Sequence, residues 1–114
     1  MAGSFDFTIE QGATFNLVMT WKIDNVPVNL TNWTARLQAR VDVEDTEVVL
    51  NLTTENGGIT LGGALGTITL NQTAIQTALL QTGSFVYDLE LISSVSSVTR
   101  LLQGELTISA EVTR

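Results

Sequence analysis

The chain has 114 residues, of which 44% are hydrophobic, and we expect one folded domain spanning residues 1–114. It contains neither histidine nor cysteine, which excludes a Ser-His-Asp triad, a Cys-His nucleophile, a zinc site built on imidazole or thiolate, and an iron–sulfur cluster. Its net charge of −7 opposes binding to the phosphate backbone of nucleic acids.

No segment approaches the roughly 18 apolar residues that a membrane-spanning helix needs. The first residues have neither a basic stretch nor an apolar run, so we expect no signal peptide and no contact with a membrane.

The polarity of the chain comes from neutral side chains rather than from charged ones. Only 15% of the residues are charged, whereas there are 17 threonines, 7 serines, 7 asparagines and 6 glutamines. Threonine suits a half-buried pleated surface, and a solvated helix would carry lysine and glutamate instead. The composition therefore indicates strands.

Alternation of apolar and polar residues predicts three strands in the first part of the chain. They run from Phe5 to Ile9, from Thr14 to Ile23, and from Trp33 to Val41, with a turn at Asp24-Asn25 before Pro27. The predicted inward faces are formed by Phe5, Phe7 and Ile9, by Phe15, Leu17, Met19, Trp21 and Ile23, and by Trp33, Ala35, Leu37, Ala39 and Val41.

The middle of the chain alternates less regularly. An acidic turn leads into a strand with Val48, Leu50 and Leu52, and the sequence Asn56-Gly57-Gly58 predicts a β-hairpin, because all three residues tolerate positive φ. Shorter strands follow at Ile59 to Leu61 and at Ile68 to Leu70, separated by a glycine-rich kink at Gly62-Gly63.

One segment has a helical period. Thr73 and the two polar residues before it offer N-cap side chains, and apolar residues recur at helical spacing until Gly83. We expect one short crossover helix within residues 73–81, packed on a sheet edge through Ala74, Ile75, Ala78 and Leu79.

The last third predicts a long strand pair. Phe85, Tyr87, Leu89 and Leu91 form one apolar face, and a serine-rich loop at residues 93–97 reverses the chain. In the strand that follows, Arg100 and Gly104 interrupt the apolar face formed by Leu102, Leu106, Ile108, Ala110 and Val112, and we interpret Gly104 as a bulge or bend. About eight such strands indicate an antiparallel sandwich or a small barrel.

Two groups of carboxylates deserve a chemical interpretation. Asp42, Glu44, Asp45 and Glu47 could hold calcium, but they lack the glycine and the ligand spacing of an EF-hand loop, so we expect a solvated turn. Asp88 and Glu90 share one strand face, as in a glycosidase pair, but outward alternation explains them. We therefore predict no catalytic residue, no metal site and no cofactor.

The aromatic and basic residues allow two interpretations each. Trp21 and Trp33 fall on apolar strand faces, where core packing is expected and a sugar-stacking platform is the alternative. Arg100 interrupts an apolar face either because the strand changes face at a bulge, or because it forms an ion pair with a carboxylate such as Asp88 or contacts another chain.

Three stretches resemble small virion structural proteins of tailed bacteriophages and prophages. They cover residues 7–15 (FTIEQGATF), residues 28–36 (VNLTNWTAR), and a C-terminal part made of residues 86–91 (VYDLEL), 100–105 (RLLQGE) and 111–114 (EVTR). The resemblance implies an all-β fold, an immunoglobulin-like antiparallel β-sandwich of the tail or baseplate region.

The expected function is that of a non-enzymatic virion structural protein, an assembly or adaptor component present in multiple copies in a symmetric particle assembled in the host cytoplasm. Its partners would be other virion proteins, with no nucleic acid and no membrane. A capsid decoration protein and a carbohydrate-binding β-sandwich module remain as alternatives. The candidate partner contacts are Asp42, Glu44, Asp45, Glu47, Arg100 and Arg114.

Overall fold

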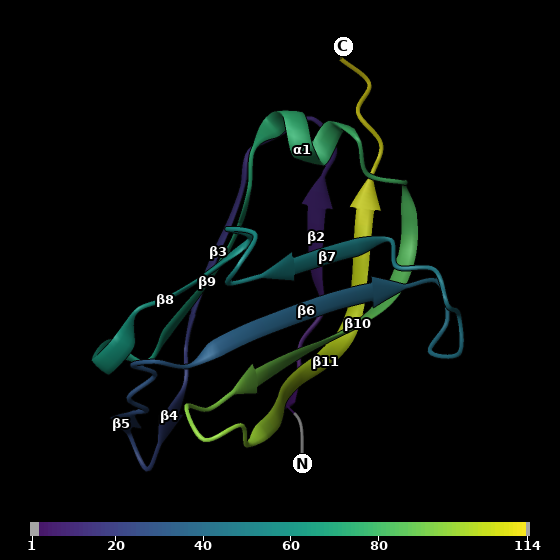
Figure 1. The fold of residues 1–114 in the computed structure, drawn as a ribbon. Coiled ribbons are helices and arrows are strands. Elements are labelled where there is room, and N and C mark those ends of the chain that lie inside the picture. Colours follow the sequence, from purple (N-terminus) through teal and green to yellow (C-terminus); the bar gives the residue numbers. More distant parts are fainter. Residues whose placement is uncertain (1–2, 114) are drawn as a thin grey trace.

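The structure, a computed structural model, describes residues 3–113, and its regular secondary structure is almost entirely β-strand (Figure 1). The strands are β1 (Gly3–Ser4), β2 (Phe7–Glu10), β3 (Phe15–Thr20), β4 (Lys22–Ile23), β5 (Val26–Pro27), β6 (Thr34–Arg40), β7 (Leu50–Thr53), β8 (Ile59–Leu61), β9 (Thr67–Gln72), β10 (Gly83–Ile92) and β11 (Val98–Ser109). One α-helix, α1 (Ala74–Ala78), and one 3₁₀-helix, η1 (Gly63–Leu65), complete the described part of the chain.

Two sheets face each other. The larger has the order β1-β11-β10-β6-β7, with β2 also pairing with β11, and the smaller has the order β3-β9-β8. The orders β11-β10-β6-β7 and β3-β9-β8 correspond to strands G-F-C-C′ and B-E-D of an immunoglobulin-type domain. The protein is thus an immunoglobulin-like β-sandwich, and eight of its described strands have three or more residues. The all-β prediction, including one short helix, is confirmed.

The core lies between the two sheets and consists mainly of inward-facing residues that alternation predicts. Leu37 on β6, Leu89 on β10 and Leu70 on β9 are fully buried. The other buried hydrophobic residues are Ile9, Leu30, Ala35, Ala39, Leu50, Leu52, Ile59, Ile68, Phe85, Tyr87, Leu91, Leu106 and Ile108.

The two N-terminal strands pair in parallel with β11. Between them, the carbonyl oxygen of Phe5 lies so close to Gly104 that a Cβ atom on that glycine would be only 2.2 Å away. Asp6 Oδ1 accepts a hydrogen bond of 2.9 Å from the backbone N–H of Glu105. Gly104 is therefore needed for the close approach of the N-terminal segment, because any side chain would displace it.

The predicted bulge at Gly104 is wrong. Gly104 pairs regularly with Tyr87, and the register shift instead lies where Leu89 pairs with Leu102 and Glu90 with Arg100, which leaves Leu101 as the extra residue. The bulge reverses the alternation of β11, so Leu101 and Leu102 both pack against the core. Arg100 consequently points outward.

The predicted hairpin at Asn56-Gly57-Gly58 is also wrong. The strands on either side of the turn belong to different sheets, because β7 pairs with β6 whereas β8 pairs with β9. Asn56 Oδ1 accepts hydrogen bonds from the backbone N–H groups of Thr53 and Gly58, and Gly57 has φ 82°. The turn chemistry is as expected, but the turn carries the chain from one layer to the other.

The ends of four predicted strands leave the core. Ile23 belongs to the small β4–β5 hairpin, which lies outside both main sheets. In the turn of this hairpin, Asp24 and Asn25 have φ 51° and 66°. Val41 follows the end of β6. The side chains of Ile23 and Val41 are both exposed, contrary to the inward faces predicted for them. The same is true of Phe5 near the start of the chain and of Ala110 and Val112 near its end. The turn at Asp24-Asn25 is confirmed.

Helix α1 lies within the predicted segment but packs on a different face. Ile75 and Leu79 are 79% and 83% exposed, whereas Thr77 is fully buried. Thr77 Oγ1 donates a hydrogen bond of 2.8 Å to the carbonyl of Ala13 and accepts one of 3.1 Å from the N–H of Gly12. The hydrogen bonds of Thr77, and not an apolar stripe, hold this short helix against the rest of the protein. The helical spacing of the apolar residues therefore predicted the wrong buried face.

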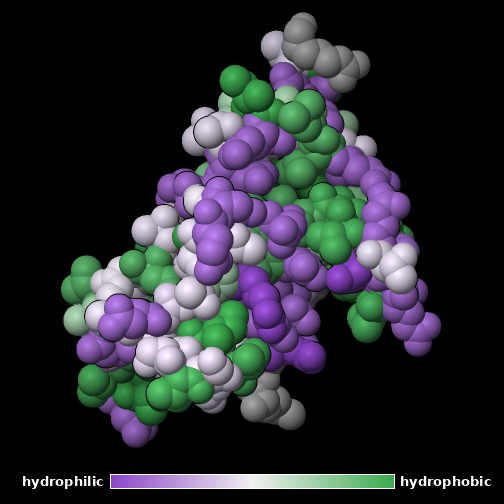
Figure 2. Space-filling view, in the orientation of Figure 1, coloured by the Kyte–Doolittle hydropathy of each residue, from purple (hydrophilic) through white to green (hydrophobic). Residues whose placement is uncertain are grey.

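Apolar surface gathers at both ends of the molecule. Figure 2 shows it around α1 at the top and around the β4–β5 hairpin at the lower left. The exposed residues are Ile75 and Leu79 at the first end, and Ile23, Val26 and Leu65 at the second.

Replacement of Leu89 by alanine tests the placement of the core. Leu89 is fully buried on the central strand β10, so Leu89→Ala should lower the free energy of unfolding by about 2–5 kcal/mol. The exposed Ser84 on the same strand provides the control, and Ser84→Ala should change it by less than about 0.5 kcal/mol. Chemical denaturation measures both, and equal midpoints would contradict the assigned faces.

Candidate functional site

The outer face of the larger sheet carries two ion pairs. Arg36 Nε contacts Glu90 Oε1 at 2.7 Å, and Arg100 Nε lies 3.5 Å from Asp88 Oδ2. All four side chains come from the neighbouring strands β6, β10 and β11. Each carboxylate of the Asp88–Glu90 pair is thus matched by an arginine, as expected of a solvated, self-compensating sheet face.

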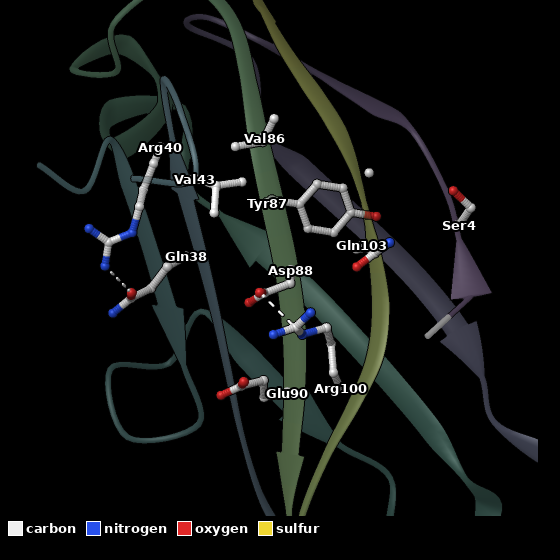
Figure 3. Close-up of a pocket in the computed structure, with 11 residues that line it drawn as sticks. Ser4, Gln38, Arg40, Val43, Val86, Tyr87, Asp88, Glu90, Arg100 and Gln103 are labelled. Atoms are coloured by element: carbon white, nitrogen blue, oxygen red, sulfur yellow. Dashed lines mark hydrogen bonds and ion pairs between the residues drawn. The ribbon is translucent and has the colours of Figure 1, made fainter. Parts of the chain in front are cut away.

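This charged face is hollowed. A depression of about 540 Å³ is lined by residues of β6, β10 and β11 together with Ser4 and Val43, and Figure 3 shows Arg100 pointing toward Asp88 across it. Arg40 donates hydrogen bonds of 2.8 Å to Gln38 Oε1 and 2.7 Å to the carbonyl of Asp45. The second bond ties the acidic turn to the rim of the depression.

The structure supports both interpretations of Arg100. The bulge at Leu101 directs it outward, and its guanidinium forms the expected ion pair with Asp88. Arg114, another candidate contact, lies outside the described residues.

The acidic turn, residues 42–47, is exposed between β6 and β7. The N–H of Asp45 donates to the carbonyl of Asp42, and the N–H of Glu44 lies 3.5 Å from Asp42 Oδ1. Among residues 3–113, no three acidic side chains of this turn or any other segment converge as a metal site would require. The turn lies near the depression through Val43, rather than forming a site of its own.

Trp21 and Trp33 pack against each other. Their rings meet edge-to-face with centroids 5.8 Å apart, and both are half-buried against the core. This arrangement supports the core interpretation, because an edge-to-face pair does not offer two open ring faces to a sugar.

The outer face of the smaller sheet contrasts with the charged face. Strands β3, β9 and β8 contain no charged residue at all. Val18, Thr69 and Thr60 form one row across the three strands, and Asn16 with Asn71 and Thr20 with Thr67 form the rows on either side. On a chain of net charge −7, this is an uncharged surface, which we call the neutral face.

A second concavity adjoins one end of the neutral face. It measures about 610 Å³ and is lined by six carboxamides, Asn16, Asn51, Asn56, Asn71, Gln72 and Gln76. Asn56 is engaged in its turn, and Gln76 in the N-cap of α1, but Gln72 Oε1 is buried with no hydrogen-bond partner among the described residues. We call this the carboxamide groove.

Sequence reasoning did not find the groove. Its residues come from three segments, residues 14–16 at β3, residues 51–58 on β7 and the β7–β8 connection, and residues 71–76 on β9 and α1, which only the sandwich brings together. The only signal was the abundance of asparagine at outward strand positions, such as Asn16, Asn51 and Asn71.

Tyr87 links the core to the N-terminal segment. Its hydroxyl donates a hydrogen bond to the carbonyl of Phe5, and its ring meets Phe7 edge-on at 4.9 Å. Burial, followed by the negative charge of Asp6, raises the pKa of Tyr87 from 10.0 to about 12. The neutral phenol is therefore the form that the folded protein holds.

Within the described residues, no helix has the length and apolar character to cross a membrane. A scan against protein-family models and a search of curated proteins both give no match.

Two solved structures are similar in outline. CopC from Methylosinus trichosporium OB3b is 13% identical, with 92% of this chain and 86% of CopC covered and a TM-score of 0.47. The extracellular domain of the voltage-gated sodium channel beta4 subunit, described in parallel homodimers with a role in cell–cell adhesion, is 12% identical, with 98% and 96% covered and a TM-score of 0.43.

The raised pKa of Tyr87 predicts a loss of stability at high pH. Because the pKa is higher in the folded than in the unfolded state, the contribution of the neutral phenol is complete below about pH 10 and is lost as pH rises toward 12. The free energy of unfolding should therefore fall more steeply between pH 10 and 12 in the natural protein than in Tyr87→Phe.

Tyr87 is the only tyrosine, so its ionisation can also be followed directly by ultraviolet absorbance of the folded protein. A midpoint near pH 10, together with identical pH slopes for the two proteins, would show that the phenol is not held in its neutral form.

Proposed function

We propose that this protein is a non-enzymatic structural component of a tailed bacteriophage particle, in the tail or baseplate region, which binds neighbouring protein chains through its neutral face. The resemblance of residues 7–15, 28–36 and the C-terminal stretches to small virion proteins supports the particle as its setting.

The observation that carries the proposal is the absence of charge from β3, β9 and β8. Burying a charge in an interface costs free energy unless the charge is paired, and the centres of protein interfaces are depleted of charged residues. Threonine and asparagine can still form hydrogen bonds across an interface. Covering the neutral face therefore costs little free energy of desolvation.

The contrast with the other sheet strengthens this choice of face. The outer face of the larger sheet holds Arg36, Arg100, Asp88 and Glu90 in intramolecular pairs, which a partner would have to desolvate or rearrange. Chains of net charge −7 also repel one another on average, and the neutral face is where that repulsion is weakest.

A charge placed in the middle of the neutral face tests the proposal. Thr69 is half-exposed on the central strand β9, so Thr69→Lys would bury an unpaired ammonium in the interface and should weaken binding at least about tenfold. Binding to purified tail and baseplate proteins is measured by biolayer interferometry, and thermal melting checks that the variant folds.

Thr107 provides the matched control, because it is also half-exposed but lies on β11 in the opposite sheet. Thr107→Lys should change the affinity less than about twofold. Equal losses in both variants, or no binding to any particle protein, would contradict the proposal. Binding to capsid proteins alone would instead support the decoration alternative.

The carboxamide groove is the observation that favours a second candidate, a carbohydrate-binding module. Carboxamides both donate and accept hydrogen bonds, as sugar hydroxyls do. No charged residue lines the groove, so a neutral oligosaccharide is the class of ligand it would suit.

A panel of neutral oligosaccharides separates the two candidates. Under the assembly proposal, the natural protein should bind no glycan at micromolar concentration. Micromolar binding that Asn51→Ala abolishes and Thr107→Ala preserves would move the function to the groove. Isothermal titration calorimetry provides the measurement.

A further inference from the structure

The edge of β3 is open in a way that differs from the constant-type immunoglobulin sandwich. There the first strand, A, pairs with strand B. Here β1 and β2 both pair with β11 in the opposite sheet, so β3, in the position of strand B, pairs only with β9 among the described strands. One side of β3 therefore has no partner strand within residues 3–113.

The hydrogen bonds around the smaller sheet show which backbone groups this open edge presents. Trp21 N–H donates to the carbonyl of Gly66 at 2.9 Å, one step beyond the pairing of Thr20 with Thr67. Antiparallel pairs alternate between bonded and non-bonded, so the odd-numbered residues of β3 bond to β9. The N–H and C=O groups of Asn16, Val18 and Thr20 then point to the open edge.

The opposite side of β9 gives an independent check. Asn71 N–H donates to the carbonyl of Gly58 at 2.9 Å, so the backbone of Asn71 is directed toward β8. Its partner on β3 is Asn16, which must therefore direct its own backbone groups away from β9. The two observations agree.

Natural edge strands are usually protected against pairing by lysine, proline, a bulge or a covering segment. The sequence of β3, FNLVMT, contains no charge and no proline, and its register with β9 is continuous over six residues. Val18, at the middle of the open edge, is 57% exposed. This is an edge that remains suited to accept a further strand.

We infer that β3 pairs antiparallel with β3 of a second copy of this chain, across a two-fold axis that passes beside Val18. This inference rests on the proposed function for the premise that the smaller sheet forms contacts with protein. It identifies the partner as a second copy of the chain. The two three-stranded sheets would join into one of six strands, with the two neutral faces continuous.

The strand is complementary to itself in this register. Val18 would face the partner subunit's Val18, which covers two exposed apolar side chains. Asn16 would face the partner subunit's Thr20, pairing polar with polar, and every backbone N–H and C=O of the open edge would find an acceptor or donor. Centring the axis on Leu17 would instead place Asn16 opposite the partner subunit's Val18, which matches polar against apolar.

Charge permits this pairing although each copy carries −7. The facing strands contain no charged residue, so no like charges come together along the edge. A closed two-fold contact also uses the same patch on both copies, as most symmetric oligomers do.

Single cysteines test the register, because the natural chain contains none. In a bonded antiparallel pair the Cα atoms lie about 5.5 Å apart, within the range that a disulfide spans. Val18→Cys should therefore form a disulfide-linked dimer under mild oxidation, and a short bismaleimide should give the same product. Denaturing electrophoresis without reductant measures the dimer.

The neighbouring positions are the matched controls. Asn16→Cys and Thr20→Cys each lie about 14 Å from the same residue of the second copy in this register, so neither should dimerise alone. A mixture of the two variants should cross-link, since each faces the other. Cross-linking of Asn16→Cys alone as fast as Val18→Cys would overturn the register and the inference.

A non-covalent readout uses a like-charge pair at the axis. Val18→Lys should raise the dimer dissociation constant at least about tenfold in analytical ultracentrifugation, because two lysines would face each other. Val98→Lys is the control, since Val98 is 51% exposed on β11 of the other sheet, and it should change the constant less than about twofold.

The outcomes separate this inference from the proposed function. A natural protein that binds tail or baseplate proteins while Val18→Cys stays monomeric would overturn the second-copy inference and leave the assembly function in place. A Val18→Cys dimer with the predicted control pattern, but no binding to particle proteins, would support the inference and overturn the proposed function.

Discussion

The close docking of the N-terminal segment on β11 determines much of the rest of the molecule. The backbone of Phe5 approaches Gly104 at a distance that admits no side chain, Tyr87 donates its hydroxyl to the Phe5 carbonyl, and Asp6 accepts from Glu105. These contacts hold β1 and β2 on the larger sheet in parallel with the last strand. Because the first strands are held there, they do not cover β3.

Charge is distributed unequally between the two layers. Alternation places polar side chains outward on both sheets, but on the larger sheet these include Arg36, Asp88, Glu90 and Arg100, and on the smaller sheet they are threonine and asparagine. The charged face satisfies itself through ion pairs, whereas the neutral face has hydrogen-bonding groups and little desolvation cost. A surface without charges, such as the neutral face, is the kind that a neighbouring protein chain can cover at low cost in free energy.

The proposed function therefore rests on the nature of one surface and on a sequence resemblance. The two similar solved structures differ from this chain at nearly nine aligned positions in ten, so their functions are not transferred to it. The open edge of β3 and the neutral face adjoin each other on one side of the sandwich, so one partner could use both. That continuity is what makes strand pairing and assembly parts of a single hypothesis.

The sequence by itself determined the class of fold and most of the core. Leu37, Leu89 and Ile108 are buried as their alternation predicts, because a period of two is a local property of the strand backbone. The turn at Asp24-Asn25 and the N-cap at Thr73 were readable for the same reason, since their signals lie within a few residues.

Only the tertiary structure decided which strands share a sheet and which apolar residues stay outside. The turn at Asn56 connects two layers instead of a hairpin, the bulge lies at Leu101 rather than Gly104, and Ile75 and Leu79 face solvent. The carboxamide groove, likewise, assembles from three segments distant in sequence. Each of these features depends on contacts between residues far apart in the chain, and local periodicity contains no information about them.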